Sequence, residues 1–66
     1  MTRREKHAAA NWGQSEYHNY RHDGMSHREA KAAVNKAGVE MYGKADWAAI
    51  FAFIVKLMDL FAKFKP

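Results

Sequence analysis

The chain has 66 residues, a formal net charge of +4 and no cysteine. This length allows one domain at most, and a domain of this size buries only about 60% of its unfolded surface, so its stability is marginal. The absence of cysteine excludes disulfide bonds and thiolate metal sites. With two serines, one threonine and no glycine-rich phosphate loop, the sequence indicates no catalytic machinery. We therefore predict a protein that is not an enzyme, with no cofactor and no small-molecule substrate.

The first segment, residues 1–24, is basic and then rich in alanine, histidine and aromatic residues. Thr2 and Glu5 have the spacing of a capping box, which would start a short helix. Because the segment contains almost no aliphatic residue, we expect it to be loosely structured. Its aromatic side chains are interpreted as a cover over an apolar helix, with their polar ends in water. These side chains are Trp12, Tyr17 and Tyr20.

Two kinds of ligand remain open for this segment. His18 and His22 are four residues apart, so a helix would place them on one face at a spacing that two metal ligands can use. Basic side chains among aromatic ones can also contact phosphates while bases stack on the rings. The candidate anion- or nucleic-acid-binding residues are Arg3, Arg4, Lys6, Arg21 and Arg28.

A second helix is predicted over about residues 26–42. The pair Asp23-Gly24 is typical of a turn, and Ser26 with Glu29 has the spacing of a capping box. Gly38 is expected to weaken the helix by about 1 kcal/mol. The predicted apolar stripe consists of Ala30, Ala33, Val34, Ala37 and Met41.

A third helix is predicted over about residues 46–64. Nine of the eleven Val, Ile, Leu and Phe residues of the chain lie in residues 46–65. Gly43 suits the end of the preceding helix, Asp46 suits an N-cap, and Pro66 cannot continue a helix. At about 100° per residue, the apolar side chains fill an arc of roughly 220°, about twice the width of an ordinary amphipathic stripe.

This wide arc predicts that the third helix is buried from two sides. We expect Ile50, Ile54, Leu57 and Phe61 to pack on the second helix. The other flank, with Trp47, Phe51, Val55 and Met58, would then face a partner. The full set of predicted partner-binding residues is Trp47, Ile50, Phe51, Ile54, Val55, Leu57, Met58, Phe61 and Phe64.

The fold class that follows is all-α, either a helical hairpin or a three-helix arrangement. Residues 1–24 would form an N-terminal segment and residues 25–66 a helical pair with a strongly apolar C-terminal helix. No signal peptide is visible, so the expected location is cytoplasmic. Lys56 and Asp59 interrupt the apolar run and disfavour a transmembrane span.

Three functions are compatible with this pattern. The leading hypothesis is a small interaction protein that buries its C-terminal helix against a second copy or a larger protein complex, as an assembly subunit or a small regulator or inhibitor. The first alternative is a membrane-surface or membrane-anchored accessory peptide, in which the apolar arc lies in lipid. The second alternative is a nucleic-acid-binding protein that uses the basic aromatic N-terminal segment.

Overall fold

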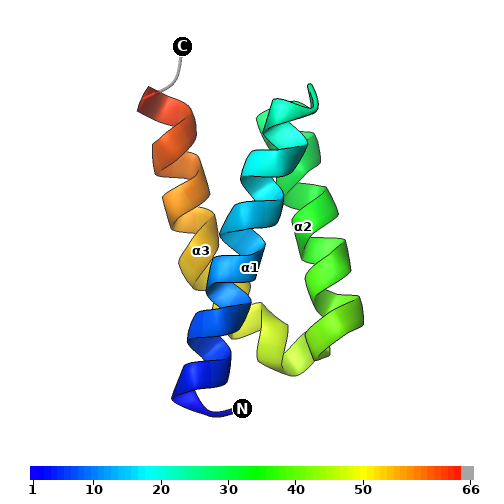
Figure 1. The fold of residues 1–66 in the computed structure, drawn as a ribbon, viewed down its shortest axis with the longest axis vertical. Coiled ribbons are helices and arrows are strands. Elements are labelled where there is room, and N and C mark those ends of the chain that lie inside the picture. Colours follow the sequence, from blue (N-terminus) through cyan, green and yellow to red (C-terminus); the bar gives the residue numbers. More distant parts are fainter. Residues whose placement is uncertain (65–66) are drawn as a thin grey trace.

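The computed structural model describes residues 1–64, and these form three α-helices without a strand. The helices are α1 (Arg3–His22), α2 (His27–Tyr42) and α3 (Lys44–Phe64). They run up, down and up, so α2 is antiparallel to both of its neighbours (Figure 1). The predicted all-α class is confirmed, in its three-helix form. Pro66, which was expected to stop the last helix, lies with Lys65 outside the described residues.

The N-terminal segment does not have the loose structure that its composition predicts. Thr2 and Glu5 form the predicted capping box: the Thr2 N–H donates to Glu5 Oε1 (2.8 Å), and the Glu5 N–H donates to Thr2 Oγ1 (3.1 Å). The helix that starts there continues for 20 residues. It buries Ala9, Gly13 and Tyr17, which lie four residues apart on one side of α1. Small side chains and one aromatic ring therefore provide the packing face, without Val, Ile, Leu or Phe.

The second helix follows its prediction closely. Ser26 is the N-cap, its hydroxyl accepts from the Glu29 N–H, and the Glu29 carboxylate accepts from the Ser26 N–H. Gly43 ends the helix with a φ of 90°, which glycine adopts without steric cost. Val34 and Ala30 are buried, as predicted, whereas Met41 is 59% exposed.

The third helix begins two residues earlier than predicted, because Gly43 serves both helices. Its N–H donates to the Val39 carbonyl at the end of α2, and its carbonyl accepts from the Trp47 N–H in the first turn of α3. Asp46 is therefore not the N-cap. It lies inside the first turn, where its carboxylate still favours the positive end of the helix dipole.

The core lies between the three helices and centres on Trp47. Its indole Nε1–H donates to Asn35 Oδ1 (3.0 Å), so the polar atom of this buried ring is satisfied. Tyr42 stacks on the indole at 5.8 Å between ring centroids, and Trp12 meets it edge-on at 5.6 Å. Trp12 thus meets α3 as the predicted aromatic cover requires, whereas Tyr17 is fully buried and its hydroxyl is hydrogen-bonded to His27 rather than to water. The buried apolar residues are Ala9, Tyr17, Ala30, Val34, Trp47, Ile50, Ile54 and Met58.

Two glycines make room for the large side chains of α3. A Cβ at Gly38 would collide with the Trp47 indole, and a Cβ at Gly13 would lie 2.6 Å from Ile54 Cδ1. Gly38 is thus the residue that lets the backbone of α2 approach the indole closely, rather than only a weak point in its helix.

Replacing Gly38 with alanine tests this packing. At a free helical position Gly→Ala raises the free energy of unfolding by about 1 kcal/mol. Here the added methyl group meets an enclosed indole, and such overpacking costs about 1–3 kcal/mol. We expect Gly38→Ala to lower the stability or leave it unchanged, in urea unfolding followed by circular dichroism. Ala32→Gly, at an exposed position of α2, measures the propensity term alone. An increase of about 1 kcal/mol in Gly38→Ala would contradict the close approach.

Candidate functional site

The outer side of α3 carries four exposed apolar side chains, which we call the outer stripe: Phe53, Leu57, Leu60 and Phe64. Their exposed fractions are 63%, 44%, 50% and 78%. The residues follow one another at spacings of four, three and four, so they line one side of the helix. This is the spacing of the seam through which one helix packs on another.

The outer stripe differs from the partner-facing flank predicted from the sequence. Trp47 and Met58 were expected to face a partner, and both are fully buried among the three helices. Leu57 and Phe61 were expected to pack on α2, and both are exposed. This division of faces was wrong because the side of α3 that carries Trp47 packs against α2 at Gly38 and Asn35 and is also covered by α1, which the sequence prediction left loosely structured.

The remaining predicted partner-binding residues fall on both sides of this division. Ile50 and Ile54 are buried in the core, whereas Phe51 and Val55 are half-buried beside α2. Of the nine predicted residues, Leu57 and Phe64 lie on the outer stripe. The sequence prediction did not include Phe53 and Leu60 among the partner-facing residues. Their spacing of four and three residues from Leu57 indicates that all three lie on the same side of the helix.

A hollow of about 310 Å³ lies between α1 and α3 where the outer stripe begins. Phe53, Ala49 and Ile50 form one wall, and Ala10 of α1 lies opposite. Lys6 and His7, also from α1, supply its polar groups. The hollow is therefore mainly apolar, with a cation from the neighbouring helix beside it.

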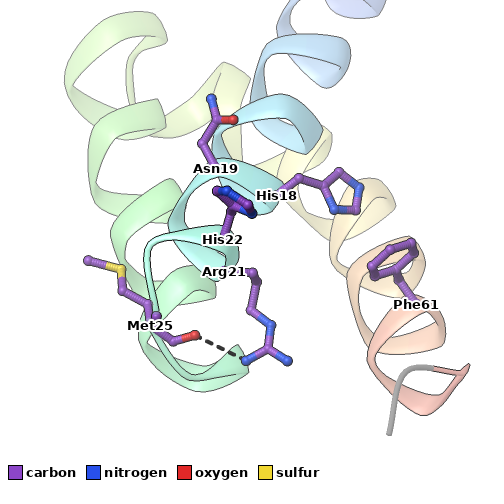
Figure 2. A pocket seen from close by; sticks show the side chains of 7 residues that line it. His18, Asn19, Arg21, His22, Met25 and Phe61 are labelled. Atoms are coloured by element: carbon purple, nitrogen blue, oxygen red, sulfur yellow. Dashed lines mark hydrogen bonds between the residues drawn. The ribbon is translucent and has the colours of Figure 1, made fainter.

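A second, polar hollow of about 640 Å³ lies at the other end of the bundle (Figure 2). His18 and Phe61 face each other across α1 and α3, with ring centroids 4.4 Å apart. Arg21 Nη1 donates to the Met25 carbonyl at 3.0 Å and so fixes the α1–α2 turn. The basic residues of this hollow lie in the last turn of α1, where cations balance the negative end of the helix dipole. Its full lining is His18, Asn19, Arg21, His22, Gly24, Met25 and Phe61.

The candidate metal and anion ligands are not gathered into one site. In residues 1–64 no three His, Asp or Glu side chains form a group that could hold a metal ion around His18 and His22 or elsewhere. Arg3, Arg4 and Lys6 lie at the start of α1, and Arg21 lies at its end, about 27 Å away along the axis. Arg28 belongs to the first turn of α2.

A polar network ties the three helices together on the side of α3 that faces α2. His27 Nε2 lies 2.8 Å from Asp59 Oδ1, and His27 Nδ1 lies 2.6 Å from the Tyr17 hydroxyl. Since a carboxylate only accepts, Nε2 carries the proton, and in the neutral imidazole Nδ1 then accepts from Tyr17. Lys31 Nζ also donates to Asp59 Oδ1 at 3.0 Å. These hydrogen bonds lower the pKa of the Asp59 carboxyl below its ordinary value of 3.8, with the bond from Lys31 as the largest cause.

The network explains why Asp59 interrupts the apolar helix. Asp59 is the one acidic residue between 47 and 64, and its carboxylate is directed to α2 rather than to the outer stripe. We interpret this arrangement as structural, because the network fixes the register of α3 against the first turns of α2.

Comparisons of the chain with protein-family models, with curated proteins and with solved structures found no match. No helix within the described part of the chain combines the length and hydropathy that crossing a membrane requires.

The polar network predicts how acid affects stability. A carboxyl group whose pKa is lowered by folding stabilises the fold above its ordinary, unfolded pKa of 3.8, and this contribution is lost as the pH falls through the lowered value. We expect Asp59→Asn to be less stable than the parent chain at pH 7. The difference should shrink as the pH falls below about 4.

Urea unfolding at a series of pH values measures this difference. Glu40→Gln is the control, because it removes an exposed carboxylate of α2 that lies outside the network. A stability difference between Asp59→Asn and the parent chain that stays constant from pH 7 into the acid range would show that the Asp59 charge does not stabilise the fold.

Proposed function

We propose that this chain is a non-enzymatic interaction protein and that it covers the outer stripe of α3 with a protein partner. The proposal extends to a small subunit of an assembly or a small regulator, either of which would use such a surface. The observation that carries it is the continuous exposed seam of Phe53, Leu57, Leu60 and Phe64 on a bundle whose core is already closed. Single exposed apolar residues are common, but a contiguous row at helix-packing spacing is typical of an interface.

The energetics support this use of the surface. Fully burying a Leu or Phe side chain contributes about 1.5–3 kcal/mol, and between 44% and 78% of each stripe residue is still exposed. Covering the stripe therefore offers roughly 1 kcal/mol per residue. For a small domain with eight buried apolar residues among residues 1–64, this is a substantial addition.

A membrane surface is the alternative occupant of the same stripe, with Lys56 and Lys63 at the level of the headgroups. The stripe is narrow for this purpose, because α1 flanks it on one side and lysines flank it on the other. A nucleic-acid function has less support, since its candidate residues are distributed over both ends of α1. The protein partner is therefore the function we favour.

The double variant Phe53→Ser/Leu60→Ser tests the proposal. Both side chains are at least half exposed, so we expect the helical content to be retained while association is lost. Sedimentation velocity at micromolar concentrations detects self-association, and cross-linking in the native host detects a different partner. Met41→Ser removes an equally exposed apolar side chain from α2 and should leave association intact. Association that survives in the double variant would refute the proposed surface.

A further inference from the structure

The charged side chains along both edges of the outer stripe are cationic. Lys56 and Lys63 are exposed, one heptad apart, and each directly precedes a stripe residue, so both lie along one edge of the seam. On the other edge Lys6 and His7 of α1 line the hollow beside Phe53. Of the two acidic residues of α3, Asp59 is held on the α2 side, and Asp46 lies in the first turn, one heptad before Phe53 and outside the stripe itself. An apolar seam with cationic edges is thus presented to a partner.

We infer that the partner of the outer stripe is an acidic amphipathic helix. This inference rests on the proposed function and specifies the chemistry of the partner. The row from Phe53 to Phe64 spans 12 residues, with about 17 Å along the axis between its ends, which is the length of three turns of a packed neighbour. Apolar side chains of the partner at spacings of three and four would enter the seam, and Asp or Glu beside them would meet Lys56 and Lys63.

The hollow between α1 and α3 receives one large side chain of that helix. Its volume of about 310 Å³ accommodates a Leu, Phe or Trp side chain against Ala10, Ile50 and Phe53. A carboxylate one turn along the partner helix would then reach the ammonium group of Lys6. Such a combination of a pocketed anchor and a paired charge is typical of the residues that dominate binding energy.

A second copy of this chain fits the stripe less well. It would bring the same lysines along its own stripe, and Asp59, the acidic residue beside them in sequence, is already bonded to Lys31 and His27. Like charges facing one another across a seam disfavour the pairing. The cationic edges therefore select against self-association and in favour of an acidic partner.

Binding of two sets of synthetic helices to the folded protein tests this inference. Both sets carry Leu and Phe at spacings of three and four over three to four turns, with Glu on the flanks in one set and Lys in the other. We expect the acidic helices to bind at least tenfold more tightly, by fluorescence anisotropy. Their affinity should fall as the salt concentration rises, because exposed charge pairs are screened.

The variant Lys56→Glu/Lys63→Glu should reverse the preference, so that the basic helices bind more tightly. Lys36→Glu/Lys44→Glu makes the same change of net charge away from the stripe and should keep the original preference. A reversal in both variants would mean that net charge alone decides, which would overturn the inference.

The remaining outcomes separate the inference from the proposed function. If both sets bind equally and Phe53→Ser/Leu60→Ser abolishes the binding, the stripe is an interface but its partner is not selected for acidic charge. Self-association through the stripe without binding of either set would likewise support the proposed interface and refute the acidic partner. Binding to vesicles that contain about one third anionic lipid, with neither set bound, would refute both and assign the stripe to a membrane surface.

Discussion

The fit of the Trp47 indole against the backbone of Gly38 is the constraint on which the rest of the structure depends. The largest buried side chain of the protein lies where any Cβ on α2 would collide with it. The indole Nε1–H donates to Asn35 Oδ1, and Trp12 and Tyr42 pack around the ring. With the indole fixed in this place, the side of α3 that carries it faces inward. In a chain of 66 residues without disulfide bonds, one well-enclosed indole supplies a large part of the apolar burial.

The orientation of α3 determines what the molecule presents to its surroundings. Ile50, Ile54 and Met58 follow Trp47 along the inward side, and the outer stripe from Phe53 to Phe64 lies on the adjacent, solvent-exposed side of the helix. The polar network at Asp59 fixes α3 at a second point, on α2, and so a rotation about the helix axis would break both contacts. The exposure of the stripe is therefore a consequence of the packing, and the cationic edges follow from where Lys56 and Lys63 lie relative to it.

The sequence predicted the elements well and their packing poorly. Both capping boxes, at Thr2 and at Ser26, and the glycine break at Gly43 depend on local chemistry, which is readable from a few neighbouring residues. The length of α1 was missed because its packing face consists of Ala9, Gly13 and Tyr17, and apolar periodicity is recognised mainly from aliphatic residues. Because α1 was not predicted as a full helix, the wide apolar arc of α3 led to the prediction that Trp47 faces a partner. The side of a helix that is covered depends on distant residues, here on the two glycines, and local patterns do not record it.

Solvent paramagnetic relaxation of assigned side-chain protons, measured on the monomeric protein, tests this orientation of α3 most directly. A soluble gadolinium chelate relaxes protons according to their distance from solvent. The structure predicts strong relaxation for Phe53, Leu57, Leu60 and Phe64, and weak relaxation for Trp47, Ile54 and Met58. Strong relaxation of the Trp47 and Met58 protons, with the stripe residues protected, would mean that α3 is rotated about its axis. The outer stripe and the partner inferred for it would then both be wrong.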